Sequence, residues 1–188
     1  MERQILFIDL DDTIISNEHT KTVLLACLKD VGFDEKVITD AYPQARGADG
    51  FFAPEAYLQA LNATPEQAAR WDLTWKSHRE GIRNGLLYGA EEFLCNIDRE
   101  KYIPTLLTLG NPSYQEDKVK ALDIADYFEA LHYCTEVKDV FLKKLPPKGA
   151  LFTIIDDRED CRTDVAKAFP TATTYAAFSD FVAAEARS

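Results

Sequence analysis

Two clusters of aspartates in this chain each follow a run of hydrophobic residues. The first is the sequence FIDLDDT with Asp9, Asp11 and Asp12, and the second is IIDD with Asp156 and Asp157. Carboxylates packed this closely need a counter-charge, and carboxylate oxygens are ligands that Mg²⁺ takes in proteins. A solvated acidic turn is the ordinary alternative for a single cluster, because Asp is a favoured turn residue.

The elements around these clusters predict an α/β fold. Five short apolar runs predict strands at residues 4–9, 102–108, 130–134, 151–155 and 172–176. Helical spacing of apolar residues predicts helices at residues 116–128 and 162–169. This alternation favours a doubly wound, mainly parallel sheet with helices on both faces. If the first and fourth strands are neighbours, both aspartate clusters lie at one edge of that sheet, where function gathers.

One interval interrupts the alternation. Residues 16–86 contain no convincing strand and read as a helical insertion with turns at residues 46–50 and 62–65. Thr64 followed by Pro65 is a helix start, with the threonine as N-cap and the proline at the first helical position. The sequence therefore predicts a helical subdomain inserted after the first strand.

The motifs together resemble those of the haloacid-dehalogenase-like superfamily. DLDDT after a hydrophobic strand is similar to its first motif, Asp-x-Asp-x-Thr, and Thr108 ends the next strand as its second motif requires. Lys138 after the third strand and Asp156-Asp157 after the fourth are similar to the third and fourth motifs. Four motifs in order are far more specific than one acidic cluster.

The resemblance covers residues 2–15 and about 87–180 and implies a Rossmann-like core with strand order 3-2-1-4-5. The core would consist of residues 1–15 and 87–188, and residues 16–86 would form a helical C1-type cap.

The resemblance to phosphatase-type members also implies an activity. Asp9 would attack a phosphomonoester to give an aspartyl-phosphate, which water then hydrolyses, and Asp11 would act as general acid and base. The implied Mg²⁺ ligands are Asp9, Asp11 through its backbone carbonyl, Asp157, and Asp156 directly or through water. The implied phosphate-binding residues are Thr108, Gly110, Asn111 and Lys138. The expected substrate is a small soluble phosphorylated metabolite.

Departures from the pattern leave some positions open. The third motif often reads Lys-Pro, whereas Lys138 is followed by aspartate, so three other lysines stay as alternatives: Lys118, Lys143 and Lys144. The fourth motif often carries another Asp a few residues on, for which Asp160 and Asp164 are both candidates.

The same fold also carries other functions. Haloacid dehalogenases share the aspartate nucleophile but typically lack the second motif aspartate, so the presence of Asp11 favours phosphate chemistry. A phosphomutase would pass the same aspartyl-phosphate to another hydroxyl. A non-catalytic binding protein is the alternative of another class, because a fold does not prove a function.

Composition limits the partners and the compartment. The formal net charge of −11 disfavours binding to a nucleic acid polymer, which is normally met by a clustered basic face. The four cysteines form no CxxC pair and are expected to be buried free thiols. No apolar stretch approaches the roughly 20 residues of a transmembrane helix, so we expect no membrane association and a cytoplasmic location. The sequence does not indicate an oligomeric state.

Overall fold

The computed structural model describes residues 3–145 and 151–187 and divides into two compact units. Unit 1 consists of Met1–Ser16, Leu86–Leu109 and Ile124–Ser188, and unit 2 of Asn17–Gly85 and Gly110–Asp123. The extreme ends of the expected core and its residues 146–150 lie outside the described residues. Segment Gly110–Asp123, which is predicted from the sequence to belong to the core, groups instead with the helical insertion in unit 2. The assignment of residues 16–86 as a cap stays a prediction.

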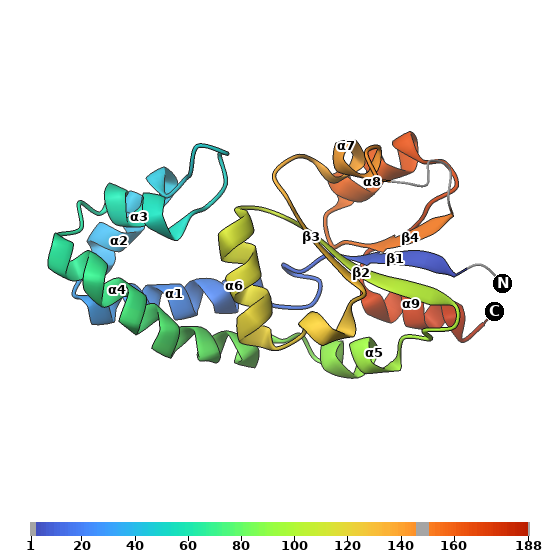
Figure 1. The fold of residues 1–188 in the computed structure, drawn as a ribbon, viewed down its shortest axis with the longest axis horizontal. Helices are drawn as coiled ribbons and strands as arrows, with labels where there is room; N and C mark the ends of the chain where they lie inside the picture. The colour runs from blue at the N-terminus through green and yellow to red at the C-terminus, as the bar shows by residue number, and fades with distance from the viewer. Residues whose placement is uncertain (1–2, 146–150, 188) are drawn as a thin grey trace. The chain divides into compact units, whose positions relative to one another are not determined.

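Unit 1 contains a five-stranded parallel sheet of order β3-β2-β1-β4-β5, which confirms the predicted fold class and strand order (Figure 1). The strands are β1 (Gln4–Ile8), β2 (Tyr102–Leu109), β3 (Ala130–Cys134), β4 (Phe152–Ile155) and β5 (Thr173–Tyr175). Central β1 pairs with both β2 and β4, and Ile8 lies opposite Leu106 on one side and Ile155 on the other. The first and fourth strands are therefore neighbours, as the convergence of the two aspartate clusters requires.

Helices cover both faces of this sheet. Figure 1 shows α7 and α8 on one face and α5 and α9 on the other. The bounds are α5 (Ala90–Asn96), the 3-10 helix η3 (Ala125–Tyr127), α7 (Lys138–Leu142), α8 (Glu159–Ala168) and α9 (Phe178–Glu185). On the α5 and α9 face, the ring of Phe181 packs edge-on against Phe93, Tyr102 and Tyr175.

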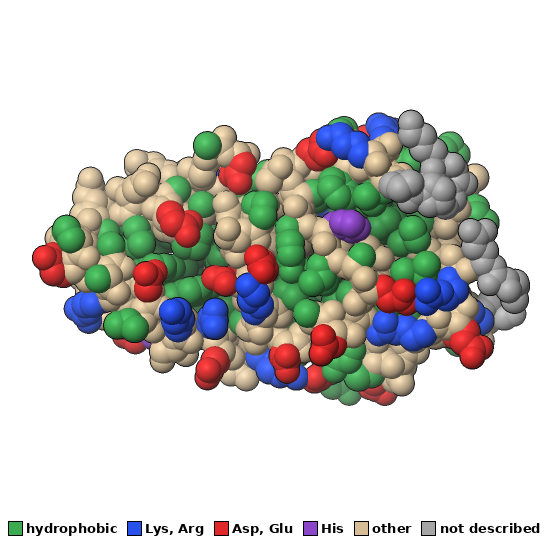
Figure 2. Space-filling view, in the orientation of Figure 1, with side chains coloured by type: hydrophobic (Ala, Val, Ile, Leu, Met, Phe, Trp, Pro, Cys, Tyr) green, Lys and Arg blue, Asp and Glu red, His purple; other side chains and the backbone are tan. Residues whose placement is uncertain are grey.

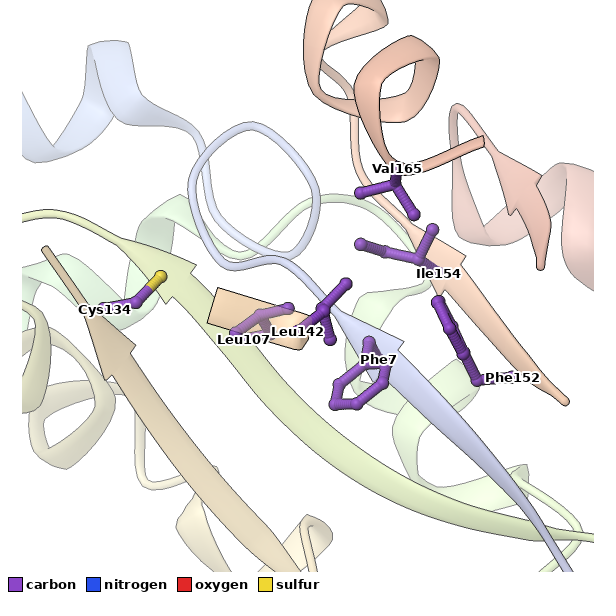
Figure 3. Packing of buried hydrophobic residues seen from close by; sticks show 7 residues of the cluster. All are labelled: Phe7, Leu107, Cys134, Leu142, Phe152, Ile154 and Val165. Carbon is purple, nitrogen blue, oxygen red and sulfur yellow. The ribbon is translucent and has the colours of Figure 1, made fainter. Parts of the chain in front are cut away.

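A hydrophobic cluster fixes α7 and α8 against the sheet. Figure 3 shows it as side chains from β1, β2, β3, β4 and the two helices: Phe7, Leu107, Cys134, Leu142, Phe152, Ile154 and Val165. All seven are buried, and the rings of Phe7 and Phe152 meet edge to face with centroids 5.5 Å apart. Phe7 lies two residues before Asp9 and Ile154 two residues before Asp156, so this packing anchors the strand segments that lead to the two aspartates.

Unit 2 is helical, as predicted for residues 16–86. Its elements are α1 (Asn17–Val31), α2 (Glu35–Ala41), η1 (Tyr42–Gln44), α3 (Pro54–Ala60), α4 (Pro65–His78), η2 (Arg79–Gly85) and α6 (Pro112–Leu122). Extended pairing in this fully described unit is limited to an isolated bridge between Arg46 and Phe52. The predicted helix start at Thr64 is confirmed, because its hydroxyl and the Gln67 side chain form a reciprocal capping box.

The helix predicted at residues 116–128 is wrong in both boundaries. It begins at Pro112, because the Asn111 side chain accepts a hydrogen bond from Tyr114 N and caps the first turn. It ends at Leu122, because Asp123 adopts a left-handed conformation with φ of 56°. The apolar spacing beyond Leu122 belongs to η3 and the entry to β3.

The surface carries charged side chains of both signs. Figure 2 shows acidic and basic side chains interspersed on the face that it presents. Among the described residues, no helix combines the length and apolar character needed to span a bilayer.

The four cysteines are free thiols, but the expectation that all are buried is wrong: Cys27 and Cys134 are buried, Cys161 is partly buried and Cys95 is exposed. Cys95 lies on the solvent side of α5, a position that its hydrophobic neighbours in sequence do not reveal.

A substitution at Leu107 tests the packing of the hydrophobic cluster. Leu107→Ala should lower the free energy of unfolding by about 2–5 kcal/mol, because it leaves a cavity at a site with no exposed surface. Urea unfolding measures this loss. The control is Leu151→Ala, at a residue that is 63% exposed, which should change stability by less than about 0.5 kcal/mol. Equal effects of the two substitutions would contradict the packing described.

Candidate active site

The pairing of β1 with β4 brings Asp9 and Asp156 together. Each is the residue directly after its strand, and Asp9 N donates a hydrogen bond to the carbonyl oxygen of Ile155 at 2.9 Å. Asp156 N donates in turn to Tyr175 O at 3.0 Å, which extends the pairing of β4 with β5. Both aspartates are buried, so their carboxylates need a compensating charge.

Lys138 supplies that charge. It is the first residue of α7, and its Nζ lies 2.7 Å from Asp9 Oδ1 and 2.6 Å from Asp156 Oδ2. Its side chain is 4% exposed, so the three charges form a buried group that we call the Asp9–Lys138–Asp156 triad. One ammonium against two carboxylates leaves the triad with a formal negative charge.

The other candidate lysines have different partners. Lys118 lies in unit 2, where its Nζ is 5.1 Å from the ring centroid of Tyr114. Lys143 pairs with Asp139 at 2.9 Å, and Lys144 pairs with Glu136 at 2.6 Å, both on the surface. Of the four lysines, Lys138 is the one that the structure places in contact with Asp9.

Burial sets the pKa values in the triad. It raises the pKa of Asp9 from 3.8 to about 6, with Lys138 opposing the shift and Asp156 adding to it. Burial acts to lower the pKa of Lys138, but Asp9 and Asp156 outweigh burial and raise it above the ordinary value. At neutral pH the triad therefore holds a charged lysine and a mostly ionised Asp9.

Asp157 adds a third carboxylate beside the triad. One carboxylate oxygen each of Asp9, Asp156 and Asp157 lies within 4.8 Å of the other two. Asp157 is exposed, and its pKa is raised by partial burial and by the charges of Asp156 and Asp12. A set of oxygen donors with net negative charge is what a hard divalent cation such as Mg²⁺ binds, so these residues fit that ion.

The turn after β1 places the rest of the first motif. Asp12 has a φ of 55°, and Asp12 N donates to Ile15 O at 2.7 Å, which closes the turn. Asp11 is half-buried in this turn and forms an isolated bridge with Ile15. The Thr13 hydroxyl accepts a hydrogen bond from Asp157 N at 3.2 Å, so it ties the two acidic loops together.

Thr108 lies near the end of β2, the strand beside β1. Its residue is 1% exposed, and among the described residues its hydroxyl Oγ1 has no hydrogen-bond partner. A buried polar atom without a partner costs free energy, and a ligand oxygen would offset that cost. This unsatisfied hydroxyl fits the predicted role of Thr108 in binding a phosphate.

Gly110 and Asn111 belong to unit 2. Asn111 uses its side-chain oxygen to cap α6, and its Nδ2 donates to Asp49 Oδ2 at 3.4 Å. A Cβ at Gly110 would lie 2.5 Å from Gln115 Nε2, so this position favours glycine. Their roles in phosphate binding stay predictions.

The two candidates for the further aspartate of the fourth motif pair with basic side chains on the surface. Asp160 pairs with Arg158, and Asp164 lies 3.5 Å from Lys167 Nζ. Two residues that contact the acidic loops were given no role from the sequence: Thr13, which ties the two loops together, and Arg162, which donates to the Asp156 and Asp157 carbonyls. The sequence signal for Thr13 is its place in DLDDT, whereas no sequence signal identifies Arg162, because its contacts depend on how α8 begins.

The thiols of unit 1 near the site are poor nucleophiles. Burial raises the pKa of Cys134 to about 11, and burial together with Asp156 raises the pKa of Cys161 further above its ordinary value. Because the thiolate is the reactive form, neither competes with the Asp9 carboxylate as a nucleophile at neutral pH.

Comparison with known proteins shows a shared fold. No protein-family model matches the chain, and no curated protein sequence does. A protein described as a haloacid dehalogenase-like hydrolase, from Burkholderia xenovorans LB400, matches with a TM-score of 0.69 at 19% identity over 92% of this chain and 81% of that chain. The HAD-hydrolase YfnB from Bacillus subtilis, in a structure bound to magnesium, matches with a TM-score of 0.54 at 12% identity over 96% of this chain and 97% of that chain.

A haloacid dehalogenase-like family hydrolase from Xanthomonas campestris matches with a TM-score of 0.53 at 18% identity over 98% of this chain and 95% of that chain. This chain therefore has the haloacid-dehalogenase-like fold, which confirms at the level of fold the resemblance drawn from its four motifs.

Lys138→Met tests the triad. It leaves two buried carboxylates facing each other, and breaking a buried ion pair costs about 3–5 kcal/mol. The folded variant relieves the repulsion by binding a proton that the unfolded chain lacks, so its stability falls as the pH rises. Urea unfolding in chelator should therefore show a larger loss at about pH 8 than at about pH 5.

The matched control is Lys143→Met, which removes an ammonium that is 53% exposed and pairs with Asp139 on the surface. It should change stability by less than about 1 kcal/mol at either pH. A Lys138→Met variant as stable as this control would contradict the buried triad.

Proposed function

We propose that this protein is a Mg²⁺-dependent hydrolase of small soluble phosphomonoesters that works through an aspartyl-phosphate on Asp9. The observation that carries the proposal is the buried Lys138 Nζ between Asp9 Oδ1 and Asp156 Oδ2, with an Asp157 oxygen within 4.8 Å of both aspartates. The proposed nucleophile, a buried ammonium and the proposed ligands of the divalent cation lie together at one sheet edge. The fold shared with haloacid-dehalogenase-like hydrolases supports this reading.

Asp9 is the proposed nucleophile. One of its oxygens attacks phosphorus in line, the bond from phosphorus to the ester oxygen breaks, and an acyl phosphate forms. Lys138 favours the ionised form of Asp9 against the effect of burial, so the carboxylate is available at neutral pH. Lys138 also stabilises negative charge on the transferring phosphoryl oxygens, as fixed cations do in buried sites.

Asp11 is the proposed proton carrier, two residues after the nucleophile. It gives its proton to the departing alkoxide in the first step and takes one from the attacking water in the second. Water then breaks the acyl phosphate, which releases inorganic phosphate and restores Asp9. This cycle needs no external oxidant or reductant.

Mg²⁺ would be held by Asp9, the Asp11 carbonyl and Asp157, with Asp156 directly or through water. When bound, it supplies charge neutralisation at the phosphoryl oxygens. The Thr108 hydroxyl, buried and unsatisfied, would donate to a phosphoryl oxygen, with Gly110 and Asn111 as further predicted contacts. Residues 16–86 are the proposed cap, which would admit small substrates and exclude bulky ones.

Phosphate release from a panel of phosphomonoesters, with and without Mg²⁺, tests the proposal. Asp9→Asn should abolish turnover of every ester, because an amide cannot form the acyl phosphate. Asp12→Asn is the matched control: it makes the same change in the same turn at an exposed residue, and Asn tolerates its positive φ. It should keep most of the activity.

Full activity in excess chelator would overturn the metal assignment. Halide release from a 2-haloacid without phosphate release would instead indicate a dehalogenase. Release of phosphate from a folded phosphoprotein, with no activity on small esters, would contradict the substrate class. Transfer of phosphate between two hydroxyls of one substrate would indicate a phosphomutase.

Asp11→Asn should fail in a different way from Asp9→Asn. Loss of a general acid slows an alkyl ester by about 10²–10⁴-fold, whereas an aryl ester loses less because phenolate departs without protonation. The second step still lacks its base, so stopped-flow mixing with an aryl phosphate should show a burst of phenol and little steady turnover. Equal losses on the two esters in the first turnover would contradict the role given to Asp11.

A further inference from the structure

Arg162 contacts the acidic loop in a way that the proposed mechanism does not use. It lies in the first turn of α8, and its Nη1 donates to the carbonyl oxygens of Asp156 and Asp157, both at 2.6 Å. The first hydrogen bond of the helix runs from Arg162 N to Arg158 O at 3.1 Å, so the carbonyls of Asp156 and Asp157 lie before the helical hydrogen bonds. The Arg162 side chain donates to these two carbonyls.

These two carbonyls flank the Cα atom of Asp157. They belong to the peptide planes on either side of that residue, and peptide planes are rigid, so fixing both planes fixes the φ and ψ angles of Asp157. Asp157 N is also held, because it donates to Thr13 Oγ1 at 3.2 Å. The backbone of Asp157 is therefore held on both sides, although its side chain is exposed.

Asp156 needs less support from Arg162. Its side chain is fully buried, Oδ2 accepts from Lys138 Nζ, and Oδ1 accepts from Arg158 N at 2.9 Å. Asp157 is the member of the three-carboxylate group whose direction depends most on its backbone. An exposed carboxylate that is free to turn would lose conformational entropy on binding a cation.

We propose that Arg162 is a positioning residue of the divalent-cation site. By donating to the carbonyls of Asp156 and Asp157, it holds the Asp157 carboxylate in the orientation that binds the cation. This inference rests on the proposed function, because it requires that the acidic group binds a cation. Residues that orient metal ligands from outside the ligand set typically contribute 10- to 100-fold in affinity or activity.

The direction in which a substitution of Arg162 changes the affinity for Mg²⁺ distinguishes positioning from a simple charge effect. The guanidinium is a positive charge near a cation site, so by Coulomb's law alone its removal should tighten Mg²⁺ binding. Positioning predicts the opposite, since removing the two hydrogen bonds frees the Asp157 backbone. Arg162→Gln should therefore weaken Mg²⁺ binding by about tenfold.

The experiment titrates the full chain with MgCl₂ by isothermal calorimetry and then measures phosphate release against Mg²⁺ concentration. Arg162→Gln should raise the Kd and the half-saturating Mg²⁺ concentration by the same factor, with kcat at saturating Mg²⁺ within about twofold of wild type, since the reacting groups remain in place. Arg162→Lys keeps the charge with a shorter reach and should give an intermediate Kd. Arg158→Gln is the matched control, because it removes the same charge from a guanidinium that binds Asp160 on the surface and not the two carbonyls, and it should raise neither value.

The outcomes are distinguishable. Wild-type protein that does not bind Mg²⁺ contradicts the proposed function and this inference together. Mg²⁺ binding that is equal in wild type and Arg162→Gln, or tighter in the variant, contradicts this inference and leaves the proposed function in place. If Arg162→Gln does not fold, Arg162→Lys decides, because it keeps the positive charge but shortens the reach to the two carbonyls: a raised Kd for Mg²⁺ supports positioning, and a wild-type Kd contradicts this inference.

Discussion

The rest of the site depends on the buried ion pairs that the ammonium of Lys138 makes with the carboxylates of Asp9 and Asp156. Each of these charges loses its water in the fold, at a cost of several kcal/mol per ion that only close partners offset. The partners meet because β1 and β4 are adjacent and α7 begins at Lys138. With Asp157 beside it, the group keeps an excess of negative charge, and a divalent cation is the natural complement.

Much of the fold could be predicted because the strands are short apolar runs bounded by polar residues, and their alternation with helices restricts the topology. The start of α4 at Pro65 followed from such a local pattern, whereas the order of the sheet followed from the resemblance of the four motifs. The position of α6 did not, because Ile124 and Phe128 continue its apolar spacing past the left-handed Asp123 that ends it. Its grouping with unit 2 depends on tertiary packing that periodicity does not encode.

The candidate site was predictable to the extent that its residues follow strand ends. Asp9 and Asp156 could be placed together from β-sheet topology, whereas the choice of Lys138 over Lys143 depended on motif order alone until their partners were known. The contacts of Arg162 could not be predicted, since a basic residue in a helix is ordinarily a solvated one and its reach depends on the loop before α8.

The central claim is that the Asp9 carboxylate, kept reactive beside Lys138, becomes covalently phosphorylated during turnover. The direct measurement mixes the protein with Mg²⁺ and an aryl phosphate, quenches with acid within the first turnover, and maps the modified peptide by mass spectrometry. We predict a phosphoryl group on Asp9 that hydroxylamine removes, as expected for an acyl phosphate. Turnover with no phosphoryl group on Asp9, or with one on a different residue, would contradict it.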